Sequence, residues 1–228
     1  MYFLPLLEES QRGTRVLYST LENEAVSFAS LLVARYKDER ETAIPLQVAE
    51  DRDGEADLKT RRVQTAYKIL SGWHGFPGID LPPSEREQVL LEWSRDVLRL
   101  SAELHRKAVG EIEVARILAR ASEMFEDGQW PCRAAREFLE GGLHSTLEDE
   151  IFTAKRNLRG MTTRAIGEGG QQESVLAAGF RAGARKLRIR WARTAALLDR
   201  LAESYEREAE VQDAEAKTQR RLWGEGPL

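Results

Sequence analysis

The stretch that decides the fold of this chain is Phe180-Arg-Ala-Gly-Ala-Arg-Lys-Leu-Arg-Ile-Arg-Trp191. Its apolar residues, Phe180, Ala184, Leu187 and Trp191, recur at positions i, i+4, i+7 and i+11. Because an α-helix turns once in about 3.6 residues, this spacing places all four on one face. Comparable stripes recur along much of the sequence, so the pattern predicts amphipathic helices that each bury one face.

Outward from this stretch, the same periodicity and the usual boundary residues mark out the other helices. Ser84 and Glu87 have the spacing of a capping box, which predicts a helix start, and Gly110 is expected to separate two helices. Helices are predicted at about 21–37, 57–73, 171–191 and 194–221, after Ser84 and Pro131, between Gly110 and Asp127, and for some ten residues from Thr146. The predicted fold is all-α, an irregular bundle of seven to nine helices that ends in a long antiparallel hairpin.

Residues 38–57 are polar and acidic and include Pro45 and Gly54, which is typical of a linker. We therefore expect an N-terminal helical segment with an acidic linker over residues 1–56 and a helical bundle domain over residues 57–228. The alternative is one continuous domain.

Composition excludes several classes of protein. With 34 basic and 38 acidic side chains the net charge is −4, which does not favour attraction of the whole surface to nucleic acid or to an anionic membrane. The single cysteine, Cys132, rules out an intrachain disulfide and is expected to be buried. No apolar run is long enough to span a bilayer, and the acidic start does not resemble a signal peptide. We expect a cytoplasmic protein with no membrane partner.

Six cations lie within thirteen residues near the end of the predicted hairpin, with no acidic residue among them. They are Arg181, Arg185, Lys186, Arg188, Arg190 and Arg193. At 100° per residue, the first, second and fourth fall on one side of the apolar stripe and the others on the opposite side. One interpretation is a face that contacts the phosphates of DNA or RNA. The favoured one is a solvated helix whose arginines pair with the acidic final helix.

Three further residues are candidates for recognition because they have no obvious core role. Asn157, Arg159 and Arg164 lie in a glycine-bearing segment that the pattern does not predict as helix, and loops of this kind often bind partners. The alternative is that such polar groups cap helices and satisfy the loop backbone. Trp223, in the charged final segment, is a candidate contact residue as well.

Other patterns do not predict chemistry. The run Gly167-Glu-Gly-Gly precedes a helix but lacks the strand and the Gly-Lys-Ser/Thr of a nucleotide-binding loop. The three histidines, at 74, 105 and 144, are far apart and without metal-ligand spacing. Acidic residues 148–150 suit the positive end of a helix better than a nuclease site. We therefore predict no enzyme activity, no cofactor, no metal and no catalytic residue.

Several segments resemble a helical domain of unknown function found within large uncharacterised bacterial proteins. They are Asp127-Gly-Gln-Trp-Pro131, Asn157-Leu-Arg-Gly-Met-Thr-Thr-Arg164, Gly169-Gly-Gln-Gln-Glu173 and the run from Trp191 to Glu206. The resemblance spans about Ser27 to Ala216 and departs from the pattern at Ala192, where a proline is expected. It implies a terminal fragment of a larger bacterial protein and carries no catalytic residue.

The function expected from these observations is a non-catalytic interaction or scaffold module that binds another protein or another domain of its parent chain. The alternative is a nucleic-acid-binding module that uses the basic face Arg181–Arg193.

Overall fold

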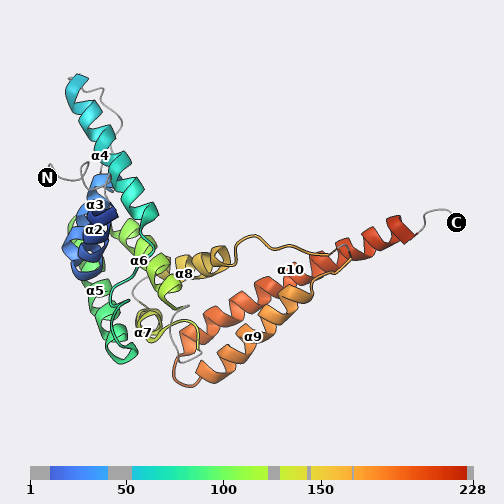
Figure 1. Ribbon diagram of the computed structural model, residues 1–228. Coiled ribbons are helices and arrows are strands. Elements are labelled where there is room, and N and C mark those ends of the chain that lie inside the picture. Colours follow the sequence, from blue (N-terminus) through green and yellow to red (C-terminus); the bar gives the residue numbers. More distant parts are fainter. Residues whose placement is uncertain (1–10, 41–52, 123–128, 143–144, 166, 225–228) are drawn as a thin grey trace. The chain divides into compact units, whose positions relative to one another are not determined.

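The computed structural model describes residues 11–40, 53–122, 129–142, 145–165 and 167–224. Within these ranges every regular element is a helix, as Figure 1 shows, and nine helices are present. The predicted all-α class is therefore confirmed. The chain forms two compact units, the first ending at Ala121 and the second beginning at Ser122.

The first unit is built around a central helix, α3, which packs against all the other helices of the unit. These helices are α2 (Gln11–Asn23), α3 (Ala25–Arg35), α4 (Asp53–Gly72), α5 (Pro83–Glu103) and α6 (Lys107–Ala121). Phe28 of α3 meets Trp73 and Trp93 with ring centroids 5.5 and 5.0 Å apart. The three rings are almost fully buried, so they form the aromatic centre of this unit's core.

The first predicted helix, at 21–37, is wrong in its extent, because the structure breaks it at Glu24. Glu24 has an extended backbone, with φ −126° and ψ 99°, and so separates α2 from α3. The break frees the backbone carbonyl of Leu21 from its helical partner. The buried indole N–H of Trp93 donates to this carbonyl at 3.0 Å. A tertiary hydrogen bond therefore replaces a local one that the periodicity alone favours.

A helix does begin at the predicted Pro82–Glu87 segment, but the capping role of Ser84 and the break at Gly110 are wrong. Helix α5 begins at Pro83 and Pro82 occupies the cap position, so Ser84 lies inside the helix and makes no capping hydrogen bond. Gly110 lies inside α6 rather than between two helices. A Cβ atom at Gly110 would be 2.5 Å from the Cβ of Ser101 on α5, so glycine is needed there for close helix packing. The chain turns instead at His105, where φ is +54°.

The second unit consists of four helices, with α10 packed against each of the other three. They are α7 (Arg133–Gly141), α8 (Ser145–Leu158), α9 (Gln171–Leu187) and α10 (Ala192–Gly224). Arg188 contacts Asp199 near the α9–α10 connection, and Gly170 contacts Asp213 at the far end of α9. The two helices therefore run in opposite directions, and α10 continues beyond the start of α9 (Figure 1).

The compact units divide between Ala121 and Ser122. Composition indicates a division after residue 56 instead. That position lies inside α4, which packs against α3 within the first unit. A polar, acidic segment thus joins two helices of one unit.

Candidate functional site

The hairpin of α9 and α10 places the basic tract on a rigid scaffold. Its core contains Ala184 and Leu187 from α9 with Ala195, Leu198 and Leu201 from α10. Phe180 and Trp191 pack against this cluster, as the predicted stripe requires. Phe180 also stacks on Tyr205, with ring planes 4° apart and centroids 5.7 Å apart. The core thus fixes the backbone positions from which the cations of α9 project.

Two of the six predicted cations pair with carboxylates of α10. Arg181 donates to Glu206 at 2.9 and 3.1 Å and to Asp199 at 3.0 Å. Arg188 donates to the other oxygen of Asp199 at 2.7 Å. The hydrogen bonds to Glu206 and Asp199 and the charges of these carboxylates raise the pKa of Arg181 above its ordinary value. These arginines join the two helices and are partly neutralised.

A third cation, Arg193, lies in the first turn of α10 beside carboxylates of two other helices. Its guanidinium is 3.5 Å from Glu148 of α8. Its backbone N–H donates to Glu140 of α7 at 3.2 Å, and the N–H and hydroxyl of Thr194 donate to the same carboxylate at 2.8 and 3.0 Å. Glu140 thus caps the positive end of α10 from a neighbouring helix.

Acidic residues of the helix α8 also have structural partners. Arg200 of α10 donates to Glu148 at 2.9 Å and to Asp149 at 2.8 Å. The pairs raise the pKa of Arg200, chiefly through the hydrogen bond to Asp149. These contacts between α8 and α10 give the acidic pair a packing role.

The remaining cations of the tract, Arg185, Lys186 and Arg190, are exposed. None of them has an acidic partner among the residues that the structure describes. The guanidinium of Arg190 lies 5.2 Å from the ring centroid of Trp191. Next to it Ile189 is fully exposed, at 101% relative accessibility. We call Lys186, Ile189 and Arg190 the hairpin tip.

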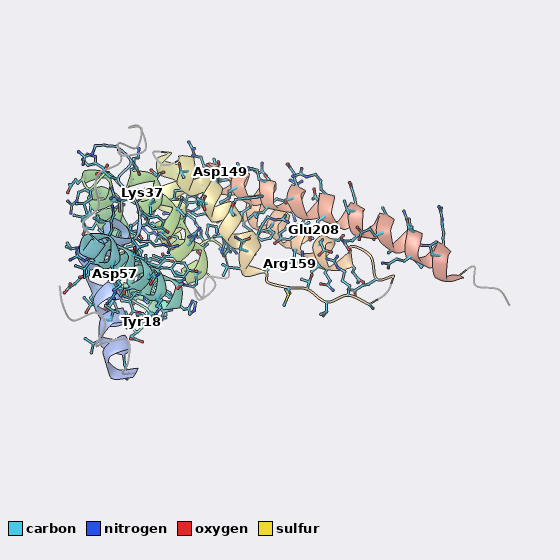
Figure 2. The ribbon with its side chains drawn as sticks, turned by 90° about the horizontal axis from the view of Figure 1, so that it is seen from above. Tyr18, Lys37, Asp57, Asp149, Arg159 and Glu208 are labelled. Atoms are coloured by element: carbon cyan, nitrogen blue, oxygen red, sulfur yellow. The ribbon has the colours of Figure 1, made fainter. Side chains whose placement is uncertain are left out.

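The segment after α8 forms a cluster of arginines around a buried carboxylate. Arg159 and Arg164 both donate to the same oxygen of Glu173, in the first turn of α9, and the Glu173 side chain is 0% exposed. Arg159 also donates to Glu208 of α10 at 3.3 Å. Both residues are labelled in Figure 2. Arg156 donates to Glu208 at 3.0 Å. We call these five residues the arginine clasp.

The clasp determines the ionisation of Glu173. Burial raises the pKa of this carboxyl, but the hydrogen bond from Arg159 and the charges of Arg159 and Arg164 outweigh burial and lower it below the ordinary 4.5. Arg156 and Arg159 also lie 5.0 and 5.4 Å from the ring centroid of Tyr205. Two of the predicted recognition residues, Arg159 and Arg164, are thus bound internally.

The other two predicted residues are not part of the clasp. Asn157 lies in the last turn of α8, is exposed, and accepts the N–H of Gly160 through its backbone carbonyl at 3.2 Å. Trp223 belongs to α10, but its side chain lies outside the described residues. Residues missed by the sequence reasoning, Glu140, Arg156 and Glu208, gave no local signal, because their partners lie about 50 residues away.

The glycine-rich run before α9 packs against α10. Gly170 donates its backbone N–H to Asp213 at 2.9 Å. A Cβ atom at Gly170 would lie 2.3 Å from the backbone oxygen of Ala209 and 2.4 Å from its Cα. Gly170 therefore allows close packing of the two helices. The run thus resembles a phosphate-binding loop only in composition.

The first unit carries a shallow groove that the sequence reasoning missed. Its volume is about 380 Å³, and it is lined by Arg35, Tyr36, Val63, Gln64, Tyr67 and Lys68. The guanidinium of Arg35 lies 4.7 Å from the ring centroid of Tyr36 and 4.8 Å from that of Tyr67. Tyr36 donates to Glu113 at 2.7 Å, and burial together with this bond raises the pKa of Tyr36 to about 12.

The part of the chain that the structure describes contains no group of three or more His, Cys, Asp or Glu side chains that could hold a metal ion. His74 and His105 belong to no group of side chains there that could hold a metal ion, and His144 lies outside the described residues. None of the described helices combines the length and the apolar character needed to cross a membrane. Comparison of the chain with protein-family models, with curated proteins and with solved structures finds no match.

Proposed function

We propose that this chain is a non-catalytic helical interaction module that binds another protein, or another domain of its parent chain, through the hairpin tip. The observation that carries the proposal is the exposure of Ile189 between two cations, Lys186 and Arg190, that have no acidic partner among the described residues. An apolar side chain beside positive charge is typical of a protein-binding surface, where apolar contacts and charge complementarity act together.

The hairpin supports this role because it presents the tip rigidly. Trp191 packs into the hairpin core immediately after the tip, and Glu140 holds the first N–H groups of α10. A surface that is held in place before binding loses less conformational entropy when a partner binds. The tip therefore combines exposure with a fixed geometry.

A protein partner is favoured over nucleic acid by the state of the basic tract. Arg181, Arg188 and Arg193 contact carboxylates of the chain itself. Phosphate binding by these arginines requires breaking such pairs or sharing their charge. The number of cations available to phosphates is thus about half of what the sequence indicates.

The test is affinity capture from an extract of the cells that encode the chain. The wild type is compared with the tip variant K186E/I189S/R190E, and bound proteins are quantified by mass spectrometry. A matched control, L58S/K59E/R62E, makes the same change of charge and likewise replaces one exposed aliphatic residue, on the exposed surface of α4. Circular dichroism establishes that all three proteins are folded.

We expect one or a few proteins to be retained equally by the wild type and by the control. The amount of these proteins bound to the tip variant is expected to be lower by at least about tenfold. Equal retention by all three proteins would contradict the proposal. So would capture that nuclease treatment removes, since that result assigns the tip to nucleic acid.

A further inference from the structure

One side of the α9–α10 hairpin carries opposite charges in two rows. Arginines recur at 181 and 185 on α9 and at its C-cap, 188, with the i, i+4, i+7 spacing of one helix side. Carboxylates recur on α10 at 199, 203, 206 and 210, with the same spacing. Contacts of Arg181 with Asp199 and Glu206 show that both rows lie on the same side of the hairpin. We call these seven residues the charged strip.

The strip is only partly neutralised within one chain. Arg181 and Arg188 contact Asp199 or Glu206, and Glu203 lies 3.9 Å from Arg181. Arg185 and Glu210 are exposed and have no ion-pair partner among the described residues. One unpaired cation and one unpaired carboxylate therefore remain on the same side.

Arg185 and Glu210 are too far apart along the hairpin to pair with each other. Arg181 contacts Glu206, so these two residues lie at about the same level. From that level Arg185 lies four residues toward the connection and Glu210 four residues away from it. At about 1.5 Å per residue the two are separated by about 12 Å along the axis.

We propose that the charged strip binds a second copy of this chain, with the two hairpins antiparallel about a twofold axis. In that arrangement Arg185 of each chain faces Glu210 of the other. The dimer therefore gains two intermolecular Arg185–Glu210 ion pairs, and both unpaired charges of each chain acquire a partner. A surface that contacts itself across a twofold axis must be self-complementary, and the strip is positive toward the connection and negative away from it. Its four carboxylates disfavour a polyanion as the occupant.

This contact uses a different side of α9 from Lys186 and does not depend on the proposed function of the hairpin tip. It consists mainly of exposed ion pairs, which are individually weak and screened by salt. The expected dimer is therefore weak, and its dissociation constant rises at least about tenfold between about 30 mM and about 500 mM salt.

Sedimentation equilibrium and light scattering on the full 228-residue chain test the proposal. Two single reversals, R185E and E210R, are compared with the wild type. Each puts like charges opposite each other at both contacts, and each is expected to weaken dimerisation by roughly tenfold or more. Neither residue has an ion-pair partner in its own chain among the described residues, so folding is expected to be intact.

Restoration is the decisive measurement. The double variant R185E/E210R exchanges the two charges and is expected to dimerise as the wild type does. An equimolar mixture of R185E and E210R is expected to form a mixed dimer, since both of its contacts are again between opposite charges. The adjacent reversal K186E, on the other side of α9, is the matched control and is expected to leave dimerisation unchanged.

Each other result overturns the proposal. A chain that stays monomeric up to about 1 mM at low salt has no such contact. A dimer insensitive to R185E and E210R uses another surface. Failure of the double variant, which has the wild-type net charge, to restore the dimer shows that Arg185 and Glu210 do not face each other across the contact. Growth beyond two chains excludes the twofold arrangement.

Discussion

Gly170 shows how a single residue without a side chain determines the approach of one helix to another. The residue stands at the cap position of α9, directly against the backbone of Ala209 on α10. Backbone atoms cannot rotate away from a clash as a long side chain can, so the neighbouring helix itself would have to move. The approach of α9 to α10 at this end therefore depends on glycine.

Replacing Gly170 by alanine is expected to lower the free energy of unfolding by about 1–3 kcal/mol, because the added methyl overpacks this contact. Gly179 is the matched control, since a Cβ atom there meets nothing within 4 Å and the residue lies inside α9. G179A is expected to raise stability by about 0.5–1 kcal/mol, since alanine favours the helix. Urea denaturation followed by circular dichroism measures both. Equal effects of the two substitutions would show that the close contact at Gly170 is not required.

At the scale of elements, the arginine clasp joins three helices. It connects the end of α8 to the start of α9 and to the middle of α10. Glu173 is its centre and is the most buried of the carboxylates in the clasp. A group whose pKa is lowered by folding adds stability that is fully present above its unfolded pKa, about 4.5. This stability is lost as the pH falls through the lower pKa of the folded state.

Substitution of Glu173 by glutamine is expected to reduce the unfolding free energy by about 1–3 kcal/mol at pH 7, because two arginines lose a charged acceptor. The difference in unfolding free energy between wild type and E173Q should become smaller as the pH falls below 4.5, since the Glu173 carboxylate of the wild type is then protonated and loses its charge. Urea titrations between about pH 7 and pH 3 measure it. E215Q, at an exposed carboxylate of α10, is the control and is expected to change stability by less than about 0.5 kcal/mol at pH 7. A gap that stays constant with pH would contradict the role of Glu173.

The elements themselves were predictable where apolar spacing was regular, as in α9 and α10 or in α4, which ends at Gly72, within one residue of the predicted end. Boundaries that depend on distant partners were not. Glu24 interrupts a regular pattern because the indole of Trp93 binds the carbonyl of Leu21. Gly110 stays within a helix because α5 lies close beside it. Local propensity cannot register either contact.

On the scale of the whole molecule, the candidate site was predictable as a set of charged residues but not as a set of partners. The sequence shows six cations, and it does not show which are paired. Arg181 contacts Glu206, 25 residues away in the sequence, and Arg193 contacts Glu148, 45 residues away. Arg159 and Arg164 were candidates for recognition, and both instead contact Glu173. Distinguishing an exposed charge from a neutralised one therefore requires the tertiary contacts.

That distinction sets the expected response of the whole chain to nucleic acid. The chain has a net charge of −4, and Arg185, Lys186 and Arg190 are the cations of the basic tract without acidic partners among the described residues. We expect no measurable binding of a fluorescent duplex DNA at about 150 mM salt. Any binding at lower salt should show a plot of log binding constant against log salt concentration with a slope no steeper than about −3. Each phosphate contact contributes about −0.9, and these three cations provide at most three contacts. Fluorescence anisotropy across a salt series measures this slope.

The variant R185E/K186E/R190E should abolish such low-salt binding, whereas L58S/K59E/R62E, which changes charge on α4, should leave it largely intact. A slope near −5, accompanied by loss of binding in R181E, would require that the pairs of Arg181 and its neighbours open to phosphate. That result would make nucleic-acid binding the favoured function in place of protein binding. The internal ion pairs would then be the closed state of a nucleic-acid-binding face, and they would not be required to hold the hairpin together.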